Sequence, residues 1–284
     1  MILVMGATGT IGSEVVRQLA ARGEKVRALN RDPATARVPA GVETAAGHHR
    51  DRASAEAAMA GAEAAFLVGV FGPDDGAHDR GLVEAATAAG VRRIVKLSAI
   101  GTGDPRLGVF GTWHLHGEEA ARASGLQWTL LRPSAFASNT LSWVPAVREG
   151  TPAPNMMGAG RQGVVDPRDV AETAVAALLD ARHAGRTYTL TGPETLGAQE
   201  QAAVLADVLG RPVPLHDLSP QERRAQLLAA GLSEDYADGL MVTARFIQEG
   251  GNDVVTGDVR EVLGRPARTY RQWAEDHASS FTRG

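Results

Sequence analysis

The sequence predicts an α/β protein built on a doubly wound parallel sheet, with a smaller, mainly helical C-terminal lobe. The chain has 284 residues, of which 44% are hydrophobic and 22% charged, enough for one large domain or two smaller ones. Its first half alternates short apolar runs with amphipathic stretches. Most runs are apolar throughout, as strands covered on both faces are, and the right-handed crossover rule then gives the doubly wound order.

The predicted elements of the first half follow one another at short intervals. Stretches of helical periodicity separate the apolar runs, and Gly23 and Gly90 stand where helices are expected to end. The predicted strands are 2–5, 25–29, 64–70, 93–97 and 126–131, and the predicted helices are 12–21 and one that includes 85–89.

The pattern changes after about residue 135. Residues 151–160 contain prolines, glycines and paired methionines and are predicted to form a loop. Residues 170–179 form an apolar-periodic helix, with Asp166 or Asp169 near its start. A short strand and three helical segments are predicted next, at 187–190, 196–209, 219–231 and 233–248.

These elements suggest two structural units. Residues 1–134, with 162–194 returning to them, are expected to form a dinucleotide-binding domain. Residues 135–161 and 195–284 are expected to form the smaller lobe, which covers the substrate at the carboxyl edge of the sheet.

Composition narrows the function classes. The net charge is −4, from 29 Lys and Arg against 33 Asp and Glu, so the chain lacks the basic surface typical of nucleic-acid binding. The absence of cysteine excludes disulfides, a cysteine nucleophile and thiolate metal sites. No apolar run approaches the roughly 18 residues of a membrane span, and the first residues lead directly into a glycine motif. We expect a cytoplasmic protein that acts on a small molecule and has no metal, nucleic-acid or membrane partner.

The glycine motif lies between the first predicted strand and the first predicted helix. Its spacing, G-x-x-G-x-x-G, is a variant of the dinucleotide fingerprint of Rossmann folds. The glycines let the backbone approach a pyrophosphate, which the N-terminus of the following helix attracts. The alternative is a tight turn that binds nothing. The cofactor-binding residues predicted here are Gly6, Thr8, Gly9, Thr10, Ile11 and Gly12.

The end of the second predicted strand distinguishes the two nicotinamide cofactors. An NAD site usually places an acid there, which binds the ribose hydroxyls. Here Leu29 is followed by Asn30 and Arg31, and Asp32 comes only after them. Asn30 does not repel a 2′-phosphate, and the guanidinium of Arg31 suits one. The sequence therefore predicts NADPH, unless Arg31 is only a solvated loop residue.

Further motifs extend over nearly the whole chain, at 6–12, 30–33, 95–98, 131–136, 165–171, 188–193, 263–266 and 269–273. Together they resemble the NmrA-like branch of atypical short-chain dehydrogenases, and most of all its NADPH-dependent quinone reductases and triphenylmethane-dye reductase. The resemblance implies a Rossmann fold, NADP binding and a homodimer. The same branch holds redox-sensing regulators that catalyse nothing, so the activity does not follow from the fold.

The chain departs from the wider family pattern at two places. Ordinary short-chain dehydrogenases use a Tyr-x-x-x-Lys pair, but neither Lys25 nor Lys96 stands four residues after a tyrosine. The corresponding helix has His114 and Glu118 at that spacing. The second departure is His48, where the family commonly has an acid near the adenine.

We predict Ser98, His114 and Glu118 as catalytic residues. Ser98, at the carboxyl end of its strand, is expected to donate to a substrate oxygen or to the nicotinamide amide. His114 and Glu118 share one helix face, so the carboxylate would orient an imidazole that donates a proton near neutral pH. The alternatives are a turn hydroxyl for Ser98 and a surface pair without chemistry for the other two. His116 points away on the same helix, which argues against a metal site.

Other residues are expected to surround the cofactor and its acceptor. Gly69 and Val70 should pass along the middle of the cofactor, and Pro133 and Phe136 should lie below the nicotinamide. The paired methionines at 156–157 are either an adaptable pocket edge or a surface loop. The aromatic side chains that either stack on a flat ring or belong to the core are Phe71, Phe110, Trp113, Phe136 and Trp143.

The leading hypothesis is an NADPH-dependent oxidoreductase that transfers hydride to a quinone or another flat, conjugated acceptor. Quinone reduction yields a delocalised anion and so suits a site without a strong acid. Only two of the 29 basic residues are lysines, which is typical of GC-rich bacterial genomes and makes an aromatic polyketide a candidate acceptor. The alternative is a non-catalytic NADP-binding redox sensor, which the missing Tyr/Lys pair favours. Another reaction on the same scaffold is the third hypothesis.

Overall fold

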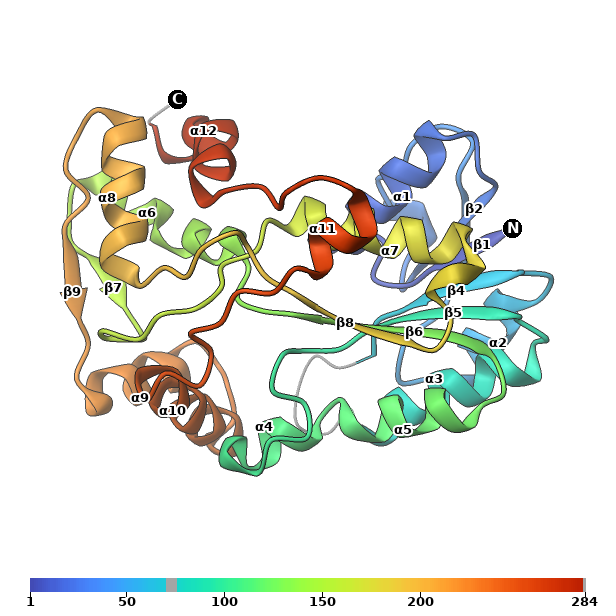
Figure 1. The fold of residues 1–284 in the computed structure, drawn as a ribbon. Coiled ribbons are helices and arrows are strands. Elements are labelled where there is room, and N and C mark those ends of the chain that lie inside the picture. Colours follow the sequence, from blue (N-terminus) through green and yellow to red (C-terminus); the bar gives the residue numbers. More distant parts are fainter. Residues whose placement is uncertain (70–75, 283–284) are drawn as a thin grey trace.

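A seven-stranded parallel sheet forms the centre of the molecule (Figure 1). The computed structural model describes residues 1–69 and 76–282. The strands lie in the order β3-β2-β1-β4-β5-β6-β8, with every neighbouring pair parallel. The strand bounds are β1 Ile2–Val4, β2 Val26–Asn30, β3 Glu43–Ala46, β4 Ala64–Leu67, β5 Arg93–Leu97, β6 Gln127–Pro133 and β8 Arg186–Leu190. The strand order reverses between β1 and β4, and a doubly wound sheet leaves a ligand crevice there.

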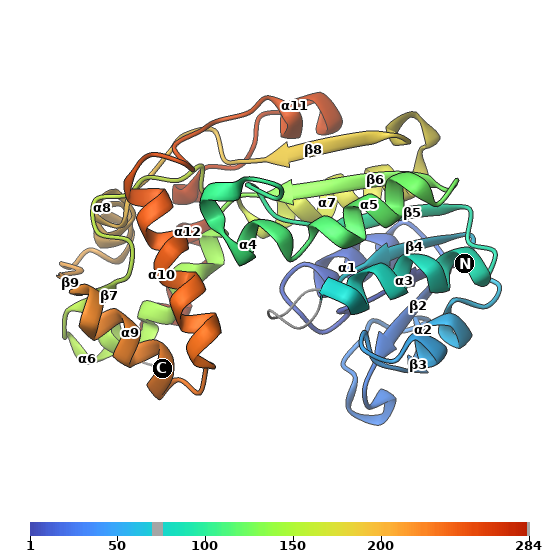
Figure 2. The same cartoon turned by 90° about the horizontal axis from the view of Figure 1, so that it is seen from below.

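Helices cover both faces of this sheet (Figure 2). One face carries α1 (Gly12–Ala21), α7 (Pro167–Leu179) and α11 (Asp258–Leu263). The other carries α2 (Arg52–Met59), α3 (Gly76–Ala88) and α5 (Leu115–Ala123).

The first strand and its continuation show why the sheet needs apolar residues at successive positions. Ile2 and Val4 pack into the core beneath α1 and α7, whereas Leu3 and Met5 pack into the core beneath α2 and α3. Side chains of a strand point alternately to opposite faces, and here both faces are buried. The predicted fold class is confirmed.

Helix boundaries follow capping signals. Asp166 caps α7, because its side chain accepts the N–H of Arg168, and Pro167 occupies the first turn. Gly23 adopts φ of +77° just after α1, a left-handed conformation that ends helices. The helix predicted over 12–21 and the strand predicted over 93–97 have these bounds in the structure.

The rest of the chain forms a mainly helical part beside the sheet (Figure 1). Three of its helices share one hydrophobic core around Trp143, Tyr270 and Trp273. A helical hairpin packs instead on the short helices that follow β5, through Leu107, Phe246 and Ile247. The helices of the first core are α6 Val144–Glu149, α8 Ala198–Leu209 and α12 Tyr270–Phe281. The hairpin is α9 Pro220–Ala229 with α10 Glu234–Gln248, and it packs on η3 Pro105–Leu107 and α4 Val109–Thr112.

The prediction of a loop over residues 151–160 is partly wrong. Three of its residues form β7 (Ala153–Asn155), which pairs in parallel with β9 (Leu215–Asp217). The N–H of Ala153 donates to the carbonyl of Pro214 at 2.9 Å. Such a short strand has no alternation to detect, and its partner is supplied by a distant part of the chain.

Ion pairs fasten the C-terminal segment to α7. Asp169 is fully buried and accepts from the side chains of Arg265 and Arg268, and both arginines also bind Glu172.

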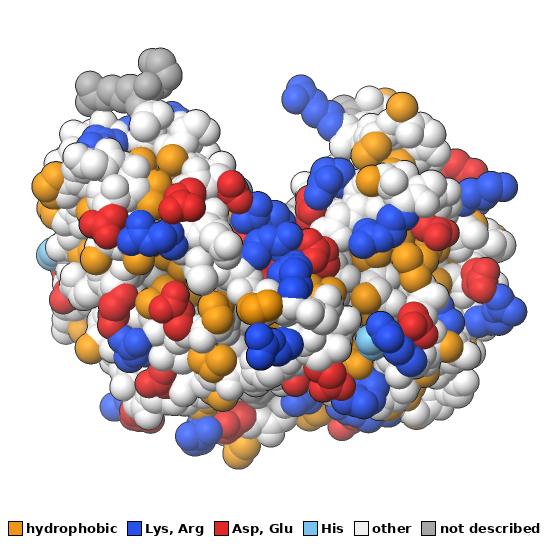
Figure 3. All heavy atoms as spheres, turned by 45° about the horizontal axis from the view of Figure 1, so that its top comes forward, with side chains coloured by type: hydrophobic (Ala, Val, Ile, Leu, Met, Phe, Trp, Pro, Cys, Tyr) orange, Lys and Arg blue, Asp and Glu red, His pale blue; other side chains and the backbone are white. Residues whose placement is uncertain are grey.

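Figure 3 shows basic and acidic side chains intermingled on the face above α7 and α11, with a notch between the two halves of the molecule. Within 1–69 and 76–282, no helix is both long enough and apolar enough to cross a bilayer.

Candidate active site

The loop between β1 and α1 folds tightly on itself. Gly6 has φ of +61°, and its carbonyl accepts the N–H of Gly9 at 2.9 Å. A Cβ on Gly12 would lie 2.2 Å from the carbonyl oxygen of Gly6 and 2.8 Å from that of Met5, so any side chain there would overlap the backbone. The glycines therefore let the loop pack directly against the start of α1, and the N-terminus of a helix is a favourable place for a pyrophosphate.

A cavity of about 380 Å³ adjoins this loop. Its lining includes five of the predicted cofactor residues, namely Gly6, Thr8, Gly9, Asn30 and Arg31. The other lining residues are Met5, Leu29, Gly47, His48, His49 and Val68. These groups come from the carboxyl ends of β1, β2, β3 and β4, so one cavity spans the predicted phosphate and ribose sites.

The remaining residues predicted near the cofactor are not among those that line this cavity. Thr10 is exposed in the loop, whereas the side chain of Ile11 belongs to the core, so only its backbone can reach a ligand. Gly69 is buried against Asp79 and Leu82. The predicted contact Val70, with Phe71 from the predicted aromatic wall, lies outside the described residues.

The end of β2 places an amide and a guanidinium beside this cavity. Asn30 is the last strand residue and is 8% exposed. Arg31 is exposed, and no described residue forms an ion pair with it. The carboxylate of Asp32 accepts the N–H of Ala34 at 3.0 Å and thereby caps a turn.

A second cavity, of about 350 Å³, opens beyond the carboxyl ends of β5 and β6. Ala99, Ile100 and Pro133 come from the sheet side, together with Ser134 and Ala135. The opposite wall contains Leu107, Phe110, Trp113, His114, Tyr236, Thr243, Phe246 and Ile247, with Gln162 and Asn252 beside it. We call this cavity the aromatic pocket.

Three of its aromatic rings form a cluster. The centroids of Phe110 and Trp113 lie 3.7 Å apart, and Tyr236 stacks on Trp113 at 5.1 Å and an interplanar angle of 24°. Burial raises the pKa of Tyr236, so its hydroxyl stays protonated. Such a wall suits a flat, conjugated ligand.

Sequence reasoning missed half of this wall. Tyr236 and Phe246 lie on α10, and Asn252 follows it, at least 100 residues from the motif at 131–136. Asn252 accepts from the Ser134 hydroxyl at 3.2 Å and donates to Gln162 at 3.0 Å. No local motif marks these residues, because they reach the pocket only through the packing of α10 on α4.

The predicted role of Ser98 is not supported. Its hydroxyl donates to Glu118 at 2.6 Å and lies 3.2 Å from the hydroxyl of Thr102. Since a serine hydroxyl has one proton, Ser98 is a structural partner of Glu118 and has no proton left for a substrate.

The predicted pairing of Glu118 with His114 is wrong. Glu118 is fully buried, and both of its oxygens accept from Arg132, at 2.8 and 2.6 Å, while Arg122 donates at 2.8 Å. Burial alone would raise the pKa of Glu118, but the hydrogen bonds from Arg132 and Ser98 outweigh it and lower the pKa. Glu118 is therefore an ionised anchor for Arg132 at the end of β6.

His114 is not an imidazolium donor. It stands at the N-cap of α5, and its Nδ1 has no hydrogen-bond partner among the described residues. Burial and then the charge of Lys96 lower the pKa of His114 to about 3. The ring is neutral at pH 7, so it contributes shape and at most a neutral N–H to the aromatic pocket.

Lys96 belongs to the interior beneath this site. Its ammonium lies 2.7 Å from Asp79, and both side chains are 1% exposed. A Cβ on Gly117 would lie 2.0 Å from a carboxylate oxygen of Asp79, so α5 passes directly over the pair. Lys96 therefore does not take the place of the lysine of the Tyr-x-x-x-Lys pair, because its ammonium is paired with Asp79.

A smaller cavity, of about 160 Å³, lies on the other side of the chain that follows β6. Phe136 and Trp143 line this cavity and not the aromatic pocket, so the predicted aromatic wall is divided. Met156 and Met157 line it too, as the pocket-edge interpretation predicts. Pro133, by contrast, lines the aromatic pocket, and its predicted place below the nicotinamide stays a prediction.

Comparison with protein families and known proteins agrees with this geometry. Residues 6–181 match a family model described as NAD(P)H-binding. The chain is 41% identical over 283 residues, 99% of both chains, to a (4-alkanoyl-5-oxo-2,5-dihydrofuran-3-yl)methyl phosphate reductase of Streptomyces griseus. It is 35% identical, again over 99% of both chains, to an NAD(P)H azoreductase of Xenophilus azovorans.

A solved structure has the same fold. An NADPH-dependent quinone oxidoreductase of Escherichia coli, complexed with NADPH, superimposes with a TM-score of 0.84 at 27% identity. The match covers 97% of this chain and 99% of the other. The similarity therefore includes the helical part as well as the sheet.

Proposed function

The chain belongs to the NAD(P)H-binding family, and from this premise we propose that it is an oxidoreductase that reduces a quinone or another flat, conjugated acceptor with NADPH. The observation that carries the proposal is the aromatic pocket, which adjoins the carboxyl ends of β5 and β6 and has a wall of stacked rings. Its described lining contains no carboxylate, lysine or arginine.

In this proposal, one set of residues binds the cofactor and another orients the acceptor. The loop at 6–12 and the cavity beside it would hold the cofactor, with Arg31 at the 2′-phosphate and no acid at position 30 to repel it. NADPH supplies the hydride when bound. Phe110, Trp113 and Tyr236 would hold the acceptor ring flat, which positions its reactive atoms.

The proton requirement fits a quinone. Hydride addition to a quinone leaves a delocalised phenolate-type anion, which takes its proton from water without a strong acid. The protonated hydroxyl of Tyr236 is the group of the pocket best able to hydrogen-bond a reduced acceptor oxygen. The proposal assigns no acid role to His114 or Glu118, because burial lowers the pKa of His114 to about 3 and the carboxylate of Glu118 is held ionised by its hydrogen bonds from Arg132 and Ser98.

The acceptor class has support from relatives. The names of the two relatives describe an azo compound and an unsaturated lactone that carries a phosphate, and both are conjugated. We therefore propose the unsaturated lactone as a second candidate acceptor. The non-catalytic sensor is disfavoured, since these relatives are named as reductases. We further propose that residues 135–161 and 195–284 act as the substrate-covering lobe, because α10 supplies Tyr236 and Phe246 to the pocket.

The first test is oxidation of NADPH, followed by absorbance, against simple and polycyclic quinones and conjugated lactones. NADH is run in parallel, and the dissociation constants of both cofactors are measured. We expect quinone-dependent turnover and binding of NADPH at least about tenfold tighter than NADH, because Arg31 has no competing carboxylate. Tight NADPH binding without turnover on any acceptor would contradict the proposed activity, and equal affinities would contradict the role of Arg31.

A further inference from the structure

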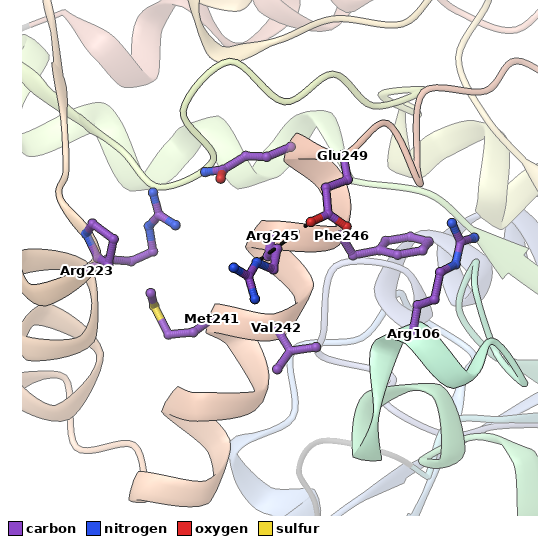
Figure 4. Close-up of a pocket in the computed structure, with 9 residues that line it drawn as sticks. Arg106, Arg223, Met241, Val242, Arg245, Phe246 and Glu249 are labelled. Atoms are coloured by element: carbon purple, nitrogen blue, oxygen red, sulfur yellow. Dashed lines mark ion pairs between the residues drawn. The ribbon is translucent and has the colours of Figure 1, made fainter.

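A third large cavity, of about 550 Å³, lies between the two helices of the α9–α10 hairpin and reaches η3. It is separate from the cofactor cavity and touches the aromatic pocket only at Phe246, which lines both. Figure 4 shows Arg223 of α9 and Arg245 of α10 extending into this space, with Met241 between their helices and Arg106 beyond Phe246. The remaining lining residues are Pro220, Val242, Gln248 and Glu249.

Arg223 is the unusual residue of this cavity. Its side chain is 5% exposed, yet no carboxylate of the described residues forms an ion pair with it. Its Nε is buried without a hydrogen-bond partner, and one Nη donates to the carbonyl of Leu218 at the long distance of 3.3 Å. Burial lowers the pKa of Arg223, and no neighbouring charge opposes that change. A guanidinium nevertheless stays charged in proteins, so the hairpin buries an uncompensated positive charge.

The other charges around the cavity do not neutralise Arg223. Arg106 is bound by both oxygens of Asp104, at 2.6 to 3.2 Å, and its guanidinium lies 4.7 Å from the ring centre of Phe246. Arg245 faces Glu249 at 3.7 Å, and both side chains are exposed. With these two pairs balanced, the cavity keeps one net positive charge, and it belongs to Arg223.

We propose that this cavity is a binding site for an oxyanion, a phosphate or carboxylate group, held by Arg223 and assisted by Arg245. A buried donor without a partner is destabilising, and more so when it is charged, and an anionic ligand that accepts from it removes this cost. The forked guanidinium presents parallel N–H groups that match two oxygens of such an anion. The anion is either free or part of a substrate whose ring lies in the aromatic pocket on the other side of Phe246.

Calorimetric titration with inorganic phosphate tests the site. The full-length protein is first saturated with NADP⁺, so that the phosphate contacts proposed for the cofactor are occupied, and the titration is run at constant ionic strength without acceptor. We expect one phosphate per chain, with Arg223→Gln weakening the dissociation constant at least tenfold and Arg223→Lys weakening it less. The matched control is Arg224→Gln on the same helix, because Arg224 is more exposed and already paired with Asp238 and Glu234. Should Arg223→Gln fail to fold, Arg245→Gln is expected to weaken binding several-fold.

The result is independent of the proposed activity. Absence of phosphate binding in the wild type, or equal weakening by Arg223→Gln and Arg224→Gln, would overturn the site even if quinones are reduced. Competition kinetics then identify the source of the anion. If phosphate raises the KM of a phosphorylated acceptor but not that of its dephosphorylated analogue, the anion belongs to the substrate. If phosphate binds and raises neither KM, the site holds a free anion.

Discussion

At the residue scale, the site depends on charged groups that are paired away from water. Glu118 is fully buried among Ser98, Arg122 and Arg132, and Asp79 is buried against Lys96. These pairs fix the ends of β5 and β6 without offering a proton to the pocket. His114 lies among them as a neutral ring, so its protonation has a cost that appears in the stability of the whole chain.

The stability of the protein should fall below pH 6.5 because of His114. Its pKa is about 3 in the folded chain and has an ordinary value of 6.5, so between these values only the unfolded chain binds the proton. Stability contributed by the neutral ring is therefore present above pH 6.5 and is lost as the pH falls. From pH 6.5 to pH 5 the loss amounts to up to about 2 kcal/mol.

Urea unfolding at both pH values measures this effect. His114→Gln should lose less stability between them than the wild type, and the difference removes the contribution of other groups such as His183, whose pKa burial also lowers. His116→Gln is the control, since His116 is exposed at the start of the same helix. An equal loss of stability in His114→Gln and wild type would show that His114 titrates normally.

At the element scale, the aromatic pocket depends on how closely α10 approaches α4. Gly239 lies in the middle of α10, and a Cβ there would lie 1.9 Å from the ring of Phe110. The missing side chain lets the two helices meet, and this contact brings Tyr236 onto Trp113. The acceptor wall is thus built between helices that are far apart in the sequence.

Gly239→Ala should raise the KM for the acceptor several-fold and leave NADPH binding unchanged, because it displaces Phe110 and not the glycine loop. The matched control is Gly81→Ala in α3, where a Cβ meets nothing within 4 Å. Replacing glycine by alanine within a helix stabilises that helix by up to about 1 kcal/mol in both variants, so the two variants differ in the overlap of the new Cβ with Phe110. An unchanged KM in Gly239→Ala would show that the aromatic pocket is not the acceptor site.

At the scale of the whole molecule, the C-terminal segment returns to the sheet and closes the structure. Asp169, at the start of α7, accepts the backbone N–H of Arg268 at 2.7 Å and the side chain of Arg265 at 2.8 Å. The segment then continues into α12, which packs on α8. One buried carboxylate therefore connects the cofactor half to the helical half. The expected homodimer stays a prediction.

Asp169→Asn should destabilise the protein by about 3 kcal/mol in urea unfolding, because it leaves Arg265 and Arg268 facing Glu172 alone. Arg186→Gln breaks a half-exposed pair with Glu261 and should change stability by less than about 1 kcal/mol. If the two variants lose the same stability, Asp169 does not act as a buried anchor.

The sheet, the glycine loop and the end of β2 could be predicted from the amino-acid sequence alone. Each depends on residues adjacent in the chain: Gly6, Gly9 and Gly12 allow a tight turn because they lack side chains, and Asn30 and Arg31 stand at the end of a strand. Local backbone preference and hydrophobic alternation act within a few residues, so a single sequence records them.

The roles of the polar residues near the acceptor pocket, by contrast, became clear from their three-dimensional neighbours. The spacing of His114 and Glu118 predicts a proton relay, but Arg132 of β6 binds the carboxylate of Glu118. Burial, and then the charge of Lys96 on β5, lowers the pKa of His114 and keeps its imidazole neutral. The packing of α9 and α10 against the rest of the chain brings three residues to the cavities that they line, namely Tyr236, Phe246 and Arg223. Charge and burial depend on neighbours brought together from distant parts of the chain, and no local pattern contains that information.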